Sequence, residues 1–305
     1  MYRLPKRLVQ ALLSDLYGVE LSLGCISKAE KRTSEVLAEP VASAHEHVKQ
    51  AAVVHADETG WKERGQKAWL WLAATATVAV FVIQPRRTMQ MAKHLLGSAF
   101  AGWLITDRFG SYGFVDALRR QLCWAHLLRD IEAFRLYGRG GKQLATQLQR
   151  PARTLIGMHH RVRDGTLSRR AFRHKARPLR REILYHLRRG AGWRNRSIAG
   201  VCSQILKLED ALFSFVDHEG IEPTNNHAER LVRHPVLWRK SSFGTDSETG
   251  SRFVERILTV VATLRLQQRN VLDYVTDACR ASLHHQSPPS LLPTPLHSLH
   301  VSQAA

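Results

Sequence analysis

The chain of 305 residues carries 45 Lys and Arg against 26 Asp and Glu, and 44% of its residues are hydrophobic. This length and composition allow one or two domains with a substantial core, which excludes a minimal peptide scaffold. The formal net charge of +19 favours a polyanionic partner.

The four cysteines, Cys25, Cys123, Cys202 and Cys279, form no Cys-x-x-Cys pair. Their spacing argues against a disulfide framework or a cysteine-rich zinc module, and it favours a reducing compartment. The N-terminal sequence MYRLPKRLVQ lacks the apolar region of a signal peptide, and no stretch approaches the length of a membrane span. We therefore expect a cytoplasmic protein with no membrane partner.

Residues 1–50 are predicted to form a helical segment. Apolar positions recur at helical spacing over 4–17, Gly18 breaks the pattern, and Ser22 can cap a second helix over 23–39. Two helices joined by a short glycine-containing turn are typical of a helix-turn-helix, although an ordinary helical hairpin gives the same pattern.

From residue 51 the pattern changes to strands. Three β-rich runs precede a helix and a fourth apolar run; the strands cover 51–57, 68–75, 77–84 and 102–107, and the helix covers 88–97. A helix between two buried strands makes them parallel. Three antiparallel strands, a helix and a fourth strand beside the first predict an α/β fold of the ribonuclease-H-like type. In this fold a mixed sheet is flanked by helices, and we expect it to span 51–283.

This topology would place two carboxylates side by side. Asp57 and Asp107 each follow a predicted strand, and the ends of those two strands are neighbours. Paired carboxylates provide the oxygen ligands for two Mg²⁺ ions in phosphodiester displacement. Taken alone, each residue also fits a structural role, Asp57 in a strand-end turn and Asp107 as a helix N-cap or in a turn before FGSYG.

The sequence EPTNNHAERLVRHP offers a third acid. Its two outer prolines predict a helix over 223–235, with Asn225, Glu229 and Arg233 on one face. Glu229 on a helix packed against the sheet could complete the metal cage. The alternative is a capping box, in which Asn226 caps the helix and Glu229 bonds back to it.

A basic stretch separates Asp107 from Glu229. Residues 108–196 contain 22 Lys and Arg against 5 acids, so that 22 − 5 = +17 and most of the net charge lies there. The stretch has helical periodicity, which predicts basic helical faces suited to a phosphate backbone. Any single arginine in it is better explained as a solvated surface residue.

Five blocks in chain order resemble the DDE transposases of the insertion sequence 66 family. The blocks are HADET at 55–59, ITDRFGSYGF at 105–114, CWAHLLRD at 123–130, TNNHAER at 224–230 and RKSSFG at 239–244. The last two blocks are the most specific, and the resemblance extends over most of the chain, from residue 4 to residue 282.

The resemblance implies a transposase of a bacterial insertion sequence that cleaves and transfers DNA strands. Asp57, Asp107 and Glu229 would form its triad and hold Mg²⁺, for which Mn²⁺ could substitute. The resemblance further implies a helical basic insertion over 108–221 and double-stranded DNA as element ends and target. A homo-oligomer assembled on DNA, and a cytoplasmic site at the nucleoid, are also implied. Phosphates would be contacted by Asn225, Asn226, Arg230, Arg233, Arg239 and Lys240.

Proteins of this family usually carry an N-terminal coiled region and a cysteine-containing zinc-binding segment, which this sequence does not show. We therefore expect an N-terminally shortened copy. Two alternatives stay open: a ribonuclease-H-like, structure-directed nuclease that does not transpose, and an inactive DNA-binding remnant of a transposase.

Several other polar residues have competing explanations. For Cys123, Trp124 and His126, packing against the sheet is favoured over metal ligation, because a lone Cys and His make a poor site. Glu58 is expected to point to the face of the strand opposite Asp57. The segment 61–64 could contact DNA or simply form a hairpin tip.

The C-terminal part is predicted to be scaffold. Residues 251–268 have a core-helix pattern, and a second helix is expected over 271–283. The proline-rich segment 284–305 is expected to be a disordered tail.

Overall fold

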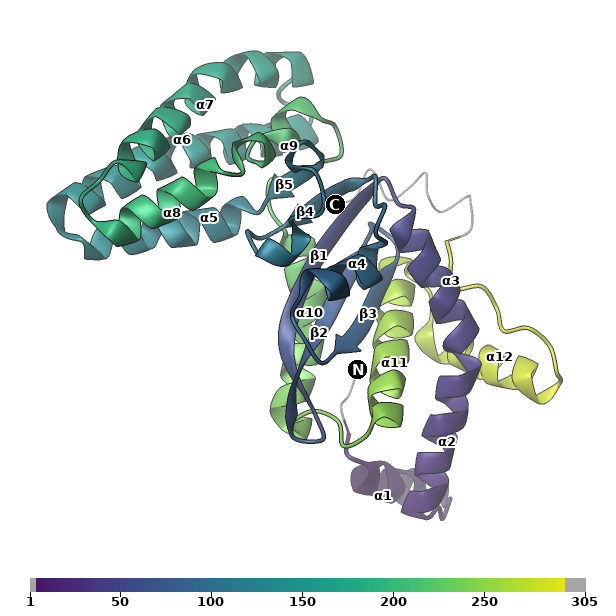
Figure 1. Cartoon of the computed structure of the whole chain (residues 1–305). Coiled ribbons are helices and arrows are strands. Elements are labelled where there is room, and N and C mark those ends of the chain that lie inside the picture. The colour runs from purple at the N-terminus through teal and green to yellow at the C-terminus, as the bar shows by residue number, and fades with distance from the viewer. Residues whose placement is uncertain (1–3, 294–305) are drawn as a thin grey trace. The chain divides into compact units, whose positions relative to one another are not determined.

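The structure, a computed structural model, describes residues 4–293 and divides into two compact units. The hairpin unit comprises Met1–Ala51, Ala56–Phe100 and Ala228–Ala305, and the helical unit comprises Ala52–His55 and Ala101–His227. The chain passes from one unit to the other after Ala51, His55, Phe100 and His227. Figure 1 identifies the elements of both units.

The strands form a five-stranded mixed sheet in the order β3-β2-β1-β4-β5. β1 is parallel to β4 and β4 to β5, whereas β2 and β3 are antiparallel. The four predicted strands and the parallel pairing of the first with the fourth are thus confirmed, and β5 is an addition. The strands are β1 (Val53–Glu63), β2 (Gln66–Ala74), β3 (Ala79–Gln84), β4 (Trp103–Thr106) and β5 (Arg120–Leu122).

A tight turn joins β1 to β2. Arg64 and Gly65 both have positive φ, 51° and 72°. Two consecutive residues of this kind form a type I′ turn, whose twist matches that of the flanking strands. β1 is therefore longer than predicted. Asp57 lies within this strand rather than at its end, and Trp61 is a buried strand residue with an exposure of 2%, which corrects the expectation of a hairpin tip at that position.

Seven helices belong wholly or mainly to the described part of the hairpin unit. The helix α11 covers the outer edge of β3, where Glu255, Thr259 and Thr263 accept hydrogen bonds from alternate backbone N–H groups of the strand. An exposed sheet edge would invite pairing with another chain, and these side chains occupy it instead. The helices are α1 (Lys6–Tyr17), α2 (Leu23–Val36), α3 (Ala38–Lys49), α4 (Met89–Leu96), α10 (Asn226–Ser242), α11 (Glu248–Leu266) and α12 (Val271–Leu283).

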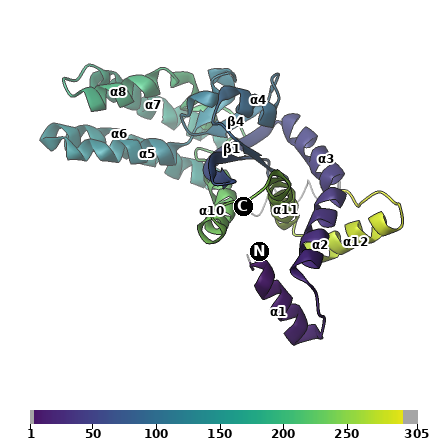
Figure 2. The same cartoon turned by 60° about the horizontal axis from the view of Figure 1, so that its bottom comes forward.

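The N-terminal segment is helical as predicted, but it contains three helices. Ser22 caps α2 by accepting from the backbone of Cys25, as expected, and α2 ends at Val36 before α3 begins. α2 packs beside α11 and α12 (Figure 2), and Arg256 donates to the Ser34 carbonyl at 2.9 Å. The helix-turn-helix interpretation of α1 and α2 stays a prediction.

The helical unit has its own core. Aliphatic and aromatic residues of its helices, among them Leu144, Phe172, Leu187 and Phe215, form one buried cluster with Ile105 of β4. The helices predicted for the basic stretch are confirmed. They are α5 (Trp124–Glu132), α6 (Gly138–Arg163), α7 (Arg169–Ala191), α8 (Arg196–Leu206) and α9 (Ser214–Asp217), with short 3₁₀ turns at Gly110–Tyr112, Ala117–Arg119, Ala133–Leu136 and Glu209–Ala211.

The predicted C-terminal helix over 271–283 is confirmed as α12. The expectation of disorder from residue 284 is wrong for 284–293. Leu291 is buried, its carbonyl accepts from Gln267 at 3.0 Å, and the Tyr274 hydroxyl donates to the Pro289 carbonyl at 2.8 Å. Arg269 also donates to the Ser290 carbonyl at 3.0 Å, so apolar burial and side-chain hydrogen bonds hold this proline-rich segment in place. Residues 294–305, the rest of the predicted tail, lie outside the described residues.

Candidate active site

The register of β1 and β4 relates the two predicted catalytic aspartates. The parallel pairs are Val53 with Trp103, Val54 with Leu104 and His55 with Ile105. Asp57 lies two residues beyond His55, and Asp107 lies two residues beyond Ile105. Asp57 belongs to the hairpin unit and lies within β1, whereas Asp107 belongs to the helical unit and directly follows β4.

Asp107 is held by the backbone around it. Its Oδ1 accepts a hydrogen bond from the Phe109 N–H at 2.8 Å, an Asx-turn, and its main-chain oxygen accepts from the Thr106 hydroxyl at 2.9 Å. Asp107 directly follows the last residue of β4, and it is half-buried. The turn role that the sequence allowed for Asp107 is thus present, and it fixes the carboxylate while leaving part of it exposed.

A residue that the sequence did not suggest supports this turn. Arg120 of β5 has an exposure of only 2%, and its Nη2 donates to the Thr106 hydroxyl at 3.2 Å and to the Asp107 carbonyl at 3.4 Å. Burial lowers the pKa of Arg120, while the nearby Asp107 and Tyr112 oppose this shift. A strand of three residues carries no periodic signal, so the sequence did not identify Arg120.

Asp57 and Glu58 are separated as strand alternation predicts. The Asp57 carboxylate is half-buried and accepts from the Glu58 N–H at 2.9 Å, whereas the Glu58 side chain is buried and ion-paired with Arg87. Arg87 in turn lies 4.9 Å above the Trp69 ring. The Glu58 side chain is therefore buried within the hairpin unit, whereas Asp57 is partly exposed to solvent.

Glu229 lies in the first turn of α10 and is half-buried. An acid in the first turn is favoured by the helix dipole, so the structural explanation of Glu229 applies alongside the catalytic one. The predicted end of this helix at Pro235 is wrong, because α10 continues through the proline to Ser242. Proline lacks one backbone hydrogen bond in a helix, and the buried Pro235 ring compensates by packing.

The residues predicted to contact phosphate fall into two groups. Asn225 and Arg239 have internal partners: Asn225 is 1% exposed and bonds His55 at 3.1 Å, and Arg239 donates to the Gly60 carbonyl. The burial of Asn225 corrects its assignment as a phosphate contact. The exposed group consists of Asn226, Arg230, Arg233 and Lys240.

The end of the block RKSSFG lies against the end of β1. Gly244 has φ of 122°, and a Cβ there would lie 2.2 Å from the Lys62 carbonyl, so only glycine fits. The next residue, Thr245, donates its N–H to Lys62 at 3.0 Å and accepts from the Arg64 N–H at 2.8 Å. The block therefore fastens the loop after α10 to the strand that carries Asp57.

Cys123 and Trp124 make packing contacts, and the preference for packing over metal ligation stays a prediction. Both are buried, the Cys123 sulfur accepts from the Asn225 N–H at 3.1 Å, and the Trp124 indole donates to the Leu212 carbonyl at 2.7 Å. His126 lies half-buried in the first turn of α5. These contacts hold α5 and the segment before α10 together within the helical unit.

Comparison with known protein families places this chain among the transposases. A family model described as "Transposase IS66 family" matches residues 2–252. Because this match covers more than half of the chain, the protein belongs to the IS66 family of transposases, and the resemblance inferred from the five blocks is confirmed.

One curated relative is similar to most of this chain. The chain is 26% identical over 261 residues to the uncharacterized protein y4qI of Sinorhizobium fredii (strain NBRC 101917 / NGR234), which covers 76% of this chain and 48% of that protein. The chain thus spans about half the length of this relative. Within residues 4–293, none of the helices is both long enough and apolar enough to span a bilayer.

Proposed function

We propose that this protein is a DDE-type DNA transposase that cleaves and transfers DNA strands, with Asp57, Asp107 and Glu229 as its catalytic acids. The observation that supports this best is the parallel pairing of β1 with β4, because Asp57 lies in β1 and Asp107 directly follows β4. Membership in the IS66 family supplies the class of reaction.

The chemistry of the three acids fits Mg²⁺. Three carboxylates are hard oxygen donors, which Mg²⁺ prefers and for which Mn²⁺ competes. All three are half-buried in the structure, so each keeps part of its surface exposed to solvent. When bound, the cations would stabilise the charges on the attacking and leaving oxygens of a phosphodiester displacement.

Other residues would orient the catalytic carboxylates or bind the DNA. The Phe109 N–H holds the Asp107 carboxylate in one orientation, and the Glu58 N–H does the same for Asp57. The exposed polar side chains of α10, on the helix that carries Glu229, would bind phosphate oxygens of double-stranded DNA; they are Asn226, Arg230, Arg233 and Lys240. We further propose a homo-oligomer assembled on element ends.

The test is nicking of supercoiled plasmid in Mg²⁺, Mn²⁺ or EDTA. The variants are Asp57→Asn, Asp107→Asn and Glu229→Gln, with Asp246→Asn, an exposed acid of the hairpin unit, as the matched control. We expect metal-dependent nicking that falls at least about 100-fold in each triad variant and is unchanged in the control.

Two outcomes would contradict the proposal. A wild-type protein that binds DNA but never nicks it would support the inactive remnant. Nicking without products joined to a second DNA, even when element ends are supplied, would support the structure-directed nuclease.

A further inference from the structure

The helix α7 is the most basic element of the helical unit. Over Arg169–Ala191 it contains nine Lys and Arg against a single acid, Glu182. Its buried face, formed by Phe172, Ala176, Ile183 and Leu187, packs into the core of that unit. The basic residues therefore occupy the remaining circumference of the helix. Six of the arginines form two sets of three, and Arg188 is ion-paired separately to Glu209 at 3.0 Å.

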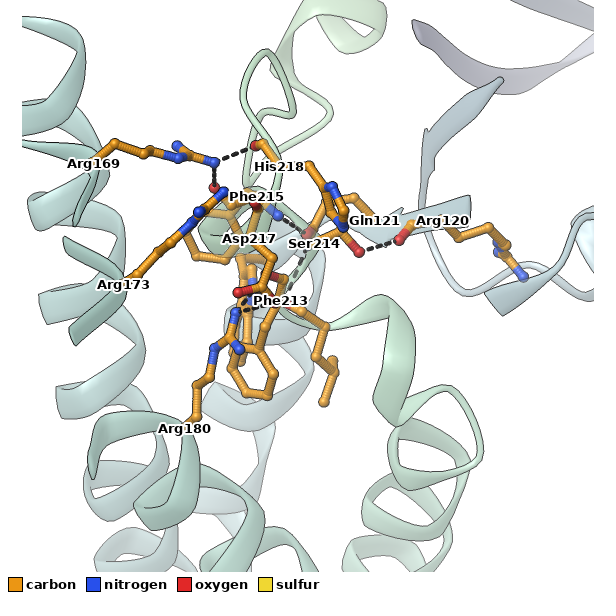
Figure 3. Close-up of polar contacts among 12 residues, drawn as sticks. Arg120, Gln121, Arg169, Arg173, Arg180, Phe213, Ser214, Phe215, Asp217 and His218 are labelled. Carbon is orange, nitrogen blue, oxygen red and sulfur yellow. Dashed lines mark hydrogen bonds and ion pairs between the residues drawn. The ribbon is translucent and has the colours of Figure 1, made fainter. Parts of the chain in front are cut away.

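The first set is structural. Arg169, Arg173 and Arg180 share one flank of α7 and point toward the segment 213–218 (Figure 3). Arg169 donates to the Phe215 carbonyl at 2.8 Å and to the His218 carbonyl. Arg173 donates to the Asp217 carbonyl. Arg180 donates to the Phe213 carbonyl at 3.0 Å and to the Asp217 carboxylate at 2.6 Å. These three guanidinium groups thus bind backbone oxygens within the unit.

The second set faces solvent. Arg170, Arg177 and Arg181 lie at positions i, i+7 and i+11, with His174 at i+4, so all four share one exposed face opposite the buried one. Within residues 4–293, the side chains of these three arginines make no hydrogen bond and no ion pair. Glu182, the helix's single acid, is ion-paired to Arg150 at 3.0 Å and so does not neutralise them.

The geometry of this face suits a polyanion whose negative charges are regularly spaced. With a rise of about 1.5 Å per residue, the three arginines span about 16 Å along a straight axis. Uncompensated arginines in such a row bind phosphates in succession, and they read no base sequence because they contact only the backbone.

We propose that the outer α7 face, defined as Arg170, His174, Arg177 and Arg181, binds the phosphate backbone of duplex DNA without sequence preference. The choice of DNA over another polyanion rests on the proposed function. The surface itself lies within the helical unit and uses none of the proposed catalytic acids.

The test compares two triple variants with equal loss of charge. Arg170→Gln, Arg177→Gln and Arg181→Gln together remove the unpaired row. The control combines Arg135→Gln, Arg150→Gln and Arg163→Gln, three arginines of the same unit that are ion-paired to Glu132, Glu182 and Glu222. Affinity for a short duplex of arbitrary sequence is measured as a function of salt.

Each lost phosphate contact lowers the slope of log affinity against log salt by about 0.9. Raising salt from about 50 mM to about 200 mM should therefore weaken wild-type binding about 40-fold more than it weakens binding by the outer-face variant. The control variant should keep most of the wild-type slope. If the outer-face variant unfolds, Arg177→Gln alone should show a difference of about 3-fold over the same range.

The two proposals fail in different ways. If the wild type binds and nicks DNA but the outer-face variant keeps the full salt slope, the surface proposal is overturned and the transposase proposal stands. The same holds if the control loses as much slope as the outer-face variant. If the wild type binds no duplex at any salt concentration, both proposals are overturned.

Discussion

The guanidinium of Arg120, almost completely buried, donates a hydrogen bond to the main-chain oxygen of Asp107 at 3.4 Å. The same nitrogen donates to the Thr106 hydroxyl, which itself donates to that oxygen at 2.9 Å. The Arg120 carbonyl meanwhile accepts from Ser214 at 2.6 Å (Figure 3). The buried Arg120 guanidinium thus holds the backbone of Asp107, a proposed catalytic acid. In turn, α9 holds β5, the strand that contains Arg120.

The first prediction concerns this positioning role. Arg120→Met should raise the Mg²⁺ concentration for half-maximal nicking about 10-fold or more, because groups that orient a metal ligand contribute to metal affinity on this scale. DNA affinity in EDTA should be unchanged. The readout is nicking rate against Mg²⁺ concentration, with DNA affinity measured in parallel.

Arg108→Met is the matched control, since Arg108 follows Asp107 directly but is ion-paired to Asp130 at 2.6 Å. It should leave the metal dependence unchanged. If Arg120→Met does not fold, Thr106→Val is the second variant, because it removes the hydroxyl that accepts from Arg120 and donates to the Asp107 carbonyl. A folded variant with wild-type metal dependence would show that Arg120 only packs.

The second prediction separates adjacent arginines of α7. Arg169→Gln should lower the free energy of unfolding of the helical unit by about 1 to 2 kcal/mol, because it removes charged donors from two carbonyls that face it. Arg170→Gln, one residue along the helix and exposed, should change it by less than about 0.5 kcal/mol. Thermal or denaturant unfolding measures both variants. Equal losses would contradict the division of α7 into a structural flank and an outer face.

Periodicity predicted much of the fold. The strands β1 to β4, the pairing of β1 with β4 and the end of α12 follow from alternation, apolar runs and helical spacing. β5 escaped prediction because three residues carry no period, and α10 was predicted too short because a buried proline can be accommodated inside a helix.

The candidate site was less accessible to sequence reasoning. The three acids could be proposed from motif and topology, but the burial of Asn225 depends on His55, which is distant in the chain. The arginines of α7 look alike in sequence, and only the partners on the segment 213–218 distinguish Arg169 from Arg170. Contacts of this kind depend on tertiary structure, so composition and spacing could not have revealed them.

The third prediction concerns the edge of β3. Thr259 is fully buried, and its hydroxyl accepts from the Phe81 N–H at 3.0 Å. Thr259→Val keeps the shape but leaves that N–H without a partner, which should cost about 1 to 3 kcal/mol of unfolding free energy. Thr249→Val, exposed in the first turn of the same helix, should cost less than about 0.5 kcal/mol. Chemical denaturation gives both values, and a Thr259→Val protein as stable as the wild type would show that α11 does not satisfy this edge.

The fourth prediction concerns Glu255, which accepts from the Ile83 N–H at the same edge. Burial raises the pKa of this carboxyl to about 7, against 4.5 for an exposed glutamate, although Arg252 opposes the shift. The folded protein therefore binds the proton more tightly than the unfolded chain does. The stabilisation is complete below about pH 4.5 and is lost as pH rises through about 7, with a total near 3 kcal/mol.

Glu255→Gln mimics the protonated acid at every pH, so its stability relative to the wild type should increase by about 3 kcal/mol between about pH 5 and about pH 8. Denaturant unfolding at several pH values measures this difference, and other titrating groups cancel because both proteins contain them. Glu248→Gln, in the exposed first turn of α11, should show no such trend. A pH-independent difference between Glu255→Gln and the wild type would mean that Glu255 is ionised in the fold, with the Arg252 ion pair outweighing the burial of the carboxylate.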